Sequence, residues 1–351
     1  MELVRSSIAA PNIALVKYWG KRDDVLKLPV NDSISITLDS GVLASKTTIM
    51  ISDRLAQDVF VINGKKTEDA HIAEALTLMR TRLGSRYPAI RNHIMIISEN
   101  NFPTSAGIAS SASGFAALAE AIASALGISD AKEKSILARL GSGSASRSVF
   151  GGFVKWNGGS RSDGEDSYGI PLAPPSHWPD LVDLIAISDT RIKKVSSKDG
   201  MERSALTSEF FIPRRDLAKR SVPKMENAIR NRDFAILAIE TMRDSNGMHA
   251  VMLDSWPPIA YMNDVSHRIV DMVHEYNGSA GAVRAAYTFD AGPNAHIITT
   301  KGEVNGIRKK LVKIKGVKKI IVSAMGEGAK SVEPDKKLVE RTLKQLRMRI
   351  D

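Results

Sequence analysis

Residues 103–114 read PTSAGIASSASG, and the apolar stretch FAALAEAIASALG follows at residues 115–127. Small residues let a backbone approach a ligand closely, and Gly127 predicts the end of a helix. A loop that runs into a helix N-terminus directs free N–H groups and the positive end of the helix dipole at an anion. We therefore predict a phosphate-binding loop that differs from the Walker loop, because GxxxxGK[ST] is absent. The alternative is a small-residue helix packed tightly against a sheet.

Around this stretch, helical segments are interrupted by short runs with the composition of strands. Asn63-Gly64 and Ala291-Gly292-Pro293 are turn signals between neighbouring strand runs, so they favour antiparallel pairing over a doubly wound parallel sheet. We predict an α+β fold, with a boundary between two lobes near the Gly/Ser/Pro-rich residues 157–180. The expected strands lie within residues 44–52, 58–64, 92–98, 151–157, 181–188, 283–289, 295–299 and 318–324.

The composition limits the class of protein. With 351 residues, of which 43% are hydrophobic and 25% charged, the chain can bury a substantial core. It has no cysteine, and its 7 histidines lack the spacing of a zinc site. The N-terminal residues lack the long apolar core of a signal peptide, and no apolar run is long enough to cross a membrane. We expect a cytoplasmic protein without membrane partners.

The net charge of +10 allows two interpretations. Much of the excess lies in residues 307–320 and 336–349, where basic residues flank apolar positions, and this pattern is typical of a solvated helix face. A nucleic-acid-binding module would use the same segments, and its affinity would fall steeply with salt. We expect no nucleic-acid partner. Part of the charge could also attract an anionic substrate.

Several segments of the chain carry a resemblance to a known family. Residues 103–112 match P-x-x-x-G-[LI]-x-S-S-A, the phosphate-loop motif of the GHMP kinase superfamily. Within this superfamily the chain resembles the mevalonate diphosphate decarboxylases. The segments that match in order are NIALVKYWGKRD, LPVNDSISITL, ENNFPTSAGIASSASGFAAL, GSGSASRSVFGGFVKW, VSSKDGM, DSNGMHAVMLDSWPPIAYMND and YTFDAGPNA.

The resemblance implies a two-lobed GHMP kinase fold, with one lobe at residues 1–185 and a second, carrying the catalytic aspartate, at residues 186–351. It also implies an ATP- and Mg²⁺-dependent carboxy-lyase of isoprenoid biosynthesis. Such an enzyme phosphorylates the C3 hydroxyl of a 5-phosphorylated mevalonate and then releases phosphate and carbon dioxide, leaving an isopentenyl product. Members of this family commonly form homodimers, so we expect a homodimer.

The matched positions imply roles for individual residues. Asp290 orients or deprotonates the C3 hydroxyl, Lys17 pairs with Asp290, and Arg147 holds the substrate carboxylate. Lys21 follows Lys17 by four positions, and we expect both lysines to line one cationic pocket. The remaining substrate-binding residues are Asn12, Tyr18, Ser142, Ser144, Lys193 and Lys194. The residues expected at the nucleotide are Pro103, Ser105, Gly107, Ser110 and Ser111, with Ser111 also at the Mg²⁺ ion.

The chemistry requires such residue types independently of the resemblance. Phosphoryl transfer needs a carboxylate near the attacking hydroxyl and cations near the phosphates. The planar guanidinium of Arg147 suits a carboxylate, which it can hold with two parallel hydrogen bonds. Taken singly, Lys17 and Arg147 could be surface cations, and Asp290 could be a turn residue that accepts backbone N–H bonds.

Three positions depart from the family pattern: Ser146 replaces a cysteine, Val30 replaces a threonine, and residues 326–329 read GEGA where G-x-G-P is usual. They leave three substrates open. We place mevalonate 5-diphosphate with ATP first, ahead of mevalonate 5-phosphate. The alternative is decarboxylation of mevalonate 3,5-bisphosphate without ATP. A catalytically silent subunit is disfavoured, because Lys17, Arg147 and Asp290 are all present.

Overall fold

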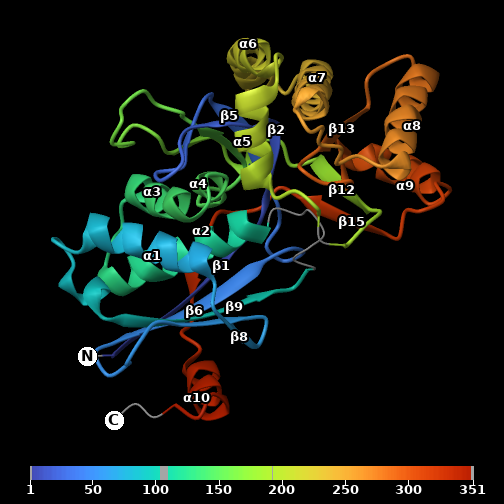
Figure 1. Ribbon diagram of the computed structural model, residues 1–351. Coiled ribbons are helices and arrows are strands. Elements are labelled where there is room, and N and C mark those ends of the chain that lie inside the picture. Colours follow the sequence, from blue (N-terminus) through green and yellow to red (C-terminus); the bar gives the residue numbers. More distant parts are fainter. Residues whose placement is uncertain (1, 103–109, 192, 349–351) are drawn as a thin grey trace.

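The computed structural model describes residues 2–102, 110–191 and 193–348, and its helices and strands form the mixed α+β fold predicted from the sequence (Figure 1). The helices are α1 (Ala70–Leu83), α2 (Ser110–Leu126), α3 (Ala131–Gly141), α4 (Ala145–Ser148), α5 (Ser197–Thr207), α6 (Phe211–Asn231), α7 (Phe234–Asp254), α8 (Asp264–Ala280), α9 (Val304–Leu311) and α10 (Lys336–Gln345). The strands are β1 (Glu2–Ala9), β2 (Asn12–Val16), β3 (Lys21–Asp23), β4 (Leu28–Pro29), β5 (Ser33–Thr37), β6 (Ser45–Ser52), β7 (Val59–Ile62), β8 (Lys65–Thr67), β9 (His93–Asn100), β10 (Phe153–Trp156), β11 (Gly169–Ala173), β12 (Leu181–Ile187), β13 (Ala285–Phe289), β14 (Ala295–Thr300), β15 (Lys319–Ala324) and β16 (Lys330–Val332).

The largest sheet has the strand order β16-β1-β6-β9-β7-β8. Its pairs are antiparallel except for β7 and β9, which run parallel. The predicted turn at Asn63-Gly64 joins β7 to β8, and both residues have positive φ angles, 49° and 75°. These angles are those of a type I′ hairpin turn, so the turn prediction is confirmed.

Helix α2 packs against β1 and β6 of this sheet. Its buried face is rich in alanine, and Ser7 Oγ of β1 donates a hydrogen bond of 2.6 Å to the carbonyl of Ala117. Such a close approach requires small residues. Gly127 follows the helix with φ of 71°, the left-handed conformation that ends helices. Tight helix packing and phosphate binding were alternative interpretations of the small residues in the sequence. The two are compatible, because a helix packed by its small residues can still present its N-terminus to a ligand.

The second sheet has the strand order β11-β10-β5-β2, and two of its strands lie in the interior of the molecule. All residues of β2 and β5 are buried, and the register between these strands shifts between Ala14 and Val16. Lys17 follows directly, outside the regular ladder. The short helix α4 packs on β5 and β10 and carries Arg147.

The third sheet, β13-β14-β12-β15, is antiparallel throughout and packs against α7 and α8. The predicted turn around residues 291–293 connects β13 to β14, and Asp290 lies at the end of β13. The predicted lobe boundary at residues 185/186 falls within β12. At the other end of the chain, β16 pairs with β1, so the last residues return to the first sheet.

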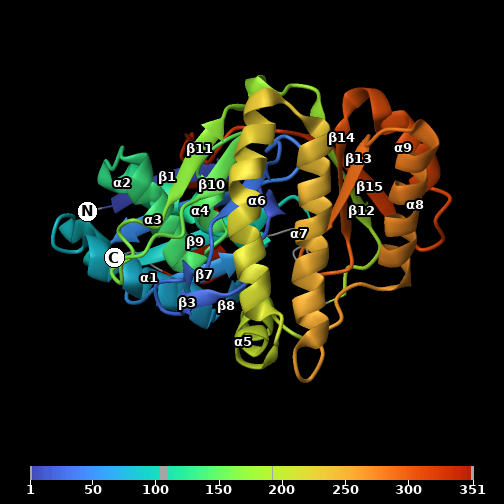
Figure 2. The same cartoon turned by 90° about the horizontal axis from the view of Figure 1, so that it is seen from above.

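Helices α6 and α7 lie side by side between the two halves of the molecule (Figure 2). Helix α7 contacts β2 on one side and β13 on the other. It therefore borders both strands that lead to the expected catalytic residues. In the residues that the structure describes, no helix is long and apolar enough to cross a membrane.

Candidate active site

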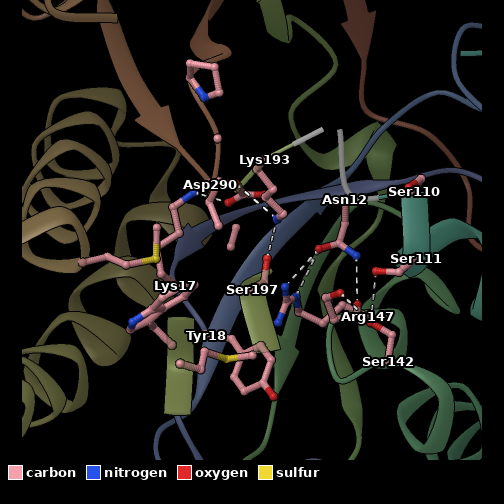
Figure 3. Close-up of a pocket in the computed structure, with 18 of the residues that line it drawn as sticks. Asn12, Lys17, Tyr18, Ser110, Ser111, Ser142, Arg147, Lys193, Ser197 and Asp290 are labelled. Carbon is pink, nitrogen blue, oxygen red and sulfur yellow. Dashed lines mark hydrogen bonds and ion pairs between the residues drawn. The ribbon is translucent and has the colours of Figure 1, made fainter. Parts of the chain in front are cut away.

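A cavity of about 600 Å³ lies where β2, β13, α2 and α4 come together. Figure 3 shows Asp290 and Lys193 on one side and Ser111, Ser142 and Arg147 on the other. This volume is in the range of small-molecule sites. Its lining includes ten residues expected from the sequence, namely Asn12, Lys17, Tyr18, Ser110, Ser111, Ser142, Ser144, Arg147, Lys193 and Asp290.

An ion pair joins Lys17 Nζ to Asp290 Oδ1 at 2.7 Å. The lysine side chain is 1% exposed and that of the aspartate 30%, so the carboxylate faces the cavity and the lysine lies behind it. Burial by itself raises the pKa of Asp290, but the charges of Lys17, His296 and Arg147 outweigh this effect and hold the pKa below its usual value. Asp290 is therefore an anion at neutral pH, able to accept a hydrogen bond from a substrate hydroxyl.

Arg147 is a buried cation whose hydrogen-bond partners, within the described residues, are neutral. Its Nη1 donates to Ser33 Oγ, its Nε to Ser35 Oγ at 3.0 Å, and its Nη2 to Asn12 Oδ1 at 3.1 Å. The residue is 2% exposed, and desolvation lowers the pKa of its guanidinium to about 10, with Asp290 opposing the shift. The charge is thus held in place by dipoles, which leaves it to interact with an anion in the cavity.

Asn12 and the serines after α3 form one connected polar wall. Asn12 Nδ2 donates to the carbonyl of Ser144 at 3.0 Å and to Ser148 Oγ at 2.8 Å, which orients its Oδ1 toward Arg147. Ser142 Oγ lies 3.2 Å from Ser144 Oγ and 3.3 Å from Ser111 Oγ. The wall therefore runs from the carboxylate-binding candidate Arg147 to the start of α2.

The N-terminus of α2 opens on the same cavity. Ser110 and Ser111 line it, and they lie at the end of the helix where backbone N–H groups favour an anion. The two hydroxyls and the helix end thus form a donor set that fits phosphate oxygens. Pro103, Ser105 and Gly107 of the predicted loop lie outside the described residues. Among those described, no cluster of acidic and histidine side chains could hold a metal by itself.

Tyr18 and Lys193 complete the expected lining. The Tyr18 ring packs edge-on against Trp156 with centroids 4.8 Å apart, and burial raises the pKa of its hydroxyl far above the usual value. Lys193 Nζ donates to Ser197 Oγ at 2.7 Å and to the carbonyl of Ala291 at 3.2 Å. This places a cation beside the turn that follows Asp290.

Two expected lysines do not line this cavity. Lys21 pairs with Asp24, and Lys194 is exposed. Residues four apart share a face when one regular helix or strand contains both, but Lys17 lies after β2 and Lys21 begins β3. Lys17 therefore lines the described cavity without Lys21, and the two lysines do not share one pocket there.

Comparison with known proteins agrees with this arrangement. Residues 9–169 match the family model of the diphosphomevalonate decarboxylase-like N-terminal domain, and residues 183–349 match that of the mevalonate 5-diphosphate decarboxylase C-terminal domain. The diphosphomevalonate decarboxylase of Aspergillus fumigatus is 45% identical over 308 residues, which are 84% of this chain and 76% of that protein. The chain belongs to the diphosphomevalonate decarboxylase family.

Solved structures of family members have the same fold. The crystal structure of mevalonate diphosphate decarboxylase from Staphylococcus aureus superposes with a TM-score of 0.87 at 36% identity, covering 95% of this chain and 99% of that one. MDDEF in complex with MVAPP, AMPPCP and magnesium has a TM-score of 0.85 at 33% identity, covering 95% of this chain and 100% of that one. The predicted GHMP-type fold and family membership are confirmed.

None of the three departures from the family pattern lines the described cavity. Ser146 is buried, and its Oγ donates to the carbonyl of Gly143 at 2.7 Å, so it supports the loop before Arg147. Val30 packs against the apolar cluster that contains Trp19 and Met201. Gly326 is hydrogen-bonded to Thr37 and Gly152 in the turn between β15 and β16. None of these residues contacts the Lys17–Asp290 pair through a hydrogen bond in the described part of the chain.

Sequence reasoning gave no role to several residues that the structure places at the site. Ser33 and Ser35 hold Arg147, and their alternation with Ile34 and Ile36 was the available signal, because every second side chain of a strand shares a face. Ser197 binds Lys193. Others line the cavity only because distant segments meet there: Arg191, Met201 and Met248.

Proposed function

We propose that this chain converts mevalonate 5-diphosphate to isopentenyl diphosphate, with consumption of ATP and release of phosphate and carbon dioxide. The observation that carries the proposal is the pairing of two features in one cavity. Asp290 is an anion backed by Lys17, and Arg147 is a buried cation held by neutral groups. One feature suits a hydroxyl that must lose a proton, and the other suits a carboxylate that must be gripped.

The geometry divides the reaction between these residues. Asp290 accepts a hydrogen bond from the C3 hydroxyl and takes its proton as the oxygen attacks the γ-phosphorus of ATP, and ADP leaves with the electrons of the broken bond between the γ-phosphorus and the β–γ bridging oxygen. Lys17 keeps Asp290 in its anionic form before the transfer and neutralises the negative charge that develops as the hydroxyl loses its proton. The C3–O bond then breaks and phosphate leaves with the bonding electrons. The C1–C2 electron pair forms the new double bond between C2 and C3, and carbon dioxide departs from the carboxylate held by Arg147.

Two observations support ATP as the second substrate: the serines at the start of α2, and the ligands of a related structure. The serines at the N-terminus of α2 border the same cavity as Asp290 and suit triphosphate oxygens. MDDEF, which is 33% identical, was solved with MVAPP, AMPPCP and magnesium together. We place ATP at this helix end, with Mg²⁺ supplying positive charge at the transferred phosphate and Ser111 as the protein group beside it. Pro103, Ser105 and Gly107 remain predicted nucleotide contacts.

The test is to supply mevalonate 5-diphosphate, mevalonate 5-phosphate and mevalonate 3,5-bisphosphate, each with and without Mg-ATP, and to measure carbon dioxide and ADP separately. We expect equal amounts of carbon dioxide and ADP from the diphosphate, and only with Mg-ATP. Carbon dioxide from the bisphosphate without ATP would overturn the proposal and select the ATP-independent enzyme.

Assembly and localisation stay predictions. Light scattering of the purified chain tests the expected homodimer, and fractionation of the source cells tests the cytoplasmic localisation. The substrate-binding roles expected of Lys21 and Lys194 also stay predictions, to be tested by the KM of Lys21→Ala and Lys194→Ala for mevalonate 5-diphosphate.

A further inference from the structure

Helix α7 has hydrogen bonds to both chain segments that carry the Lys17–Asp290 pair. Lys17 follows β2, and Asp290 follows β13, and α7 packs against both strands. In Figure 2 the helix runs between the halves of the molecule. Two consecutive residues of α7, Asp244 and Ser245, make these bonds.

Asp244 and its partner Arg214 hold the backbone of Lys17. Asp244 Oδ1 accepts the Lys17 N–H at 2.7 Å and also accepts from Arg214 Nη2 at 3.0 Å. Arg214 Nη2 donates in turn to the Lys17 carbonyl at 3.2 Å, as does Asn31 Nδ2 at 3.2 Å. Lys17 lies beyond the last residue of β2, so these side chains take the place of strand hydrogen bonds at both of its backbone groups.

Ser245 holds the chain next to Asp290, the other member of the ion pair. Its Oγ accepts the N–H of Phe289 at 3.0 Å, one residue before Asp290. Successive helix residues point in directions about 100° apart, so neighbouring positions of α7 can reach β2 and β13 separately. His249 lies about one turn further along and packs edge-on against the Phe289 ring, with centroids 6.1 Å apart. The backbone at Lys17 and the backbone next to Asp290 are thus both hydrogen-bonded to α7.

The ion pair between Arg214 and Asp244 is deeply buried, with side chains 4% and 1% exposed. Burial of two charges is costly, and such pairs often add little net stability. An arrangement meant only to join α6 and α7 could use apolar side chains. Here the charged groups also bond the backbone of Lys17, which apolar side chains could not do.

We propose that Asp244 is a positioning residue: through the Lys17 N–H, and with Arg214, it sets the place from which Lys17 reaches Asp290. The inference rests on the proposed function, because the position of Lys17 affects turnover only if the Lys17–Asp290 pair is catalytic. Asp244 itself is one step removed from the cavity, since the described cavity lining contains Lys17 and Asp290 but not Asp244.

The test compares Asp244→Ala, Asp244→Asn and a control on the same helix. Asp244→Ala removes the acceptor for the Lys17 N–H, and we expect kcat to fall about 10- to 100-fold, as displacement of a catalytic group by about 1 Å can do, while KM for mevalonate 5-diphosphate changes less than about threefold. Asp244→Asn keeps an Oδ1 acceptor for both Lys17 and Arg214, so it should restore most of kcat. A loss of kcat as large in Asp244→Asn as in Asp244→Ala would overturn the inference.

Glu240→Ala is the matched control. Glu240 lies one turn earlier on α7, is 5% exposed, and binds Ser221 at 2.7 Å and Lys224 at 3.2 Å away from the cavity. Its loss should lower the thermal stability much as Asp244→Ala does but leave kcat unchanged. An equal fall of kcat in both variants would mean that α7 acts only through general stability.

A second readout needs no turnover. In protein with isotope-labelled lysine side chains, the NMR signal of Lys17, assigned with Lys17→Arg, should move toward that of solvated lysines in Asp244→Ala and stay in place in Glu240→Ala. An inactive wild type would overturn the proposed function and leave this comparison intact. An unmoved Lys17 signal in folded Asp244→Ala would overturn the positioning role, and if this variant does not fold, Ser245→Ala tests the bond to Phe289 by the same measurements.

Discussion

Lys17 Nζ and Asp290 Oδ1 are 2.7 Å apart although 273 residues separate them in the chain. Both residues line the cavity, but the lysine side chain is 1% exposed and that of the aspartate 30%, so the carboxylate is the more open of the two groups. This difference in exposure supports the proposed roles, in which Asp290 takes the proton and Lys17 compensates charge. If Lys17 were the more exposed residue and Asp290 the enclosed one, Lys17 would be the better candidate for contact with the substrate.

Asp290→Asn should fold and bind substrate but lose kcat by about 10²- to 10⁴-fold, because the amide cannot take the proton of the C3 hydroxyl. Initial rates of carbon dioxide release, with substrate binding followed by calorimetry, check this. Turnover near the wild-type rate would show that another group accepts the proton.

Arg147→Lys retains a positive charge but loses the planar fork. We expect KM for mevalonate 5-diphosphate to rise and carbon dioxide release to slow by about tenfold or more, because a point charge cannot grip the carboxylate with two parallel bonds. The variant also leaves some of the oxygens of Asn12, Ser33 and Ser35 without donors, at a cost of roughly 1–3 kcal/mol each if they stay dry. Thermal unfolding separates the two effects, and unaltered kinetics would contradict the role of Arg147.

Gly328→Ala should destabilise the fold by about 1–3 kcal/mol or more. An added Cβ would lie 2.2 Å from the carbonyl oxygen of Val149 and 2.7 Å from the Cα of Phe150, both of them backbone atoms. Gly302→Ala is the control, since a Cβ there meets no atom within 4 Å. Urea unfolding of the two variants measures the difference, and equal midpoints would refute the prediction.

The ion pair of Asp58 and Arg80 should contribute stability that is lost in acid. Both carboxylate oxygens accept from Arg80 at 2.7 Å, and Oδ1 also accepts the Ile94 N–H at 2.9 Å. Burial raises the pKa of Asp58, but these bonds outweigh it, so the folded-state pKa lies below the usual value. Because the folded pKa is the lower one, the contribution is present above the unfolded pKa of about 3.9 and disappears as the pH falls through the folded pKa.

The measurement for this pair is the free energy of unfolding of wild type and Asp58→Asn as a function of pH. The gap between the free energies of the two proteins should be present at about pH 5 and narrow below about pH 4. A gap that persists unchanged to about pH 2 would contradict the assignment.

Several strands could be predicted and others could not. The runs that became β6, β9, β12 and β14 are continuous in apolar and β-branched residues, so their pattern was sufficient. Strand β1 was not predicted, because Ser6 and Ser7 interrupt its apolar pattern. In the fold these serines are buried and bonded to Thr48 at 2.7 Å and to the Ala117 carbonyl at 2.6 Å. A buried serine looks like a surface residue until its partner is known.

The ordered motifs were enough to determine the family, the helix that starts at the phosphate loop, and the residue types of the site, because these depend on local pattern and on chemistry. Only the tertiary structure decided which groups meet. It placed Lys17 behind Asp290, gave Arg147 neutral partners from β2 and β5, moved Lys21 to Asp24, and joined both halves of the ion pair to α7. The physical reason is that desolvation and hydrogen-bond partners are set by segments far apart in the chain, and their contact exists only once the core has formed.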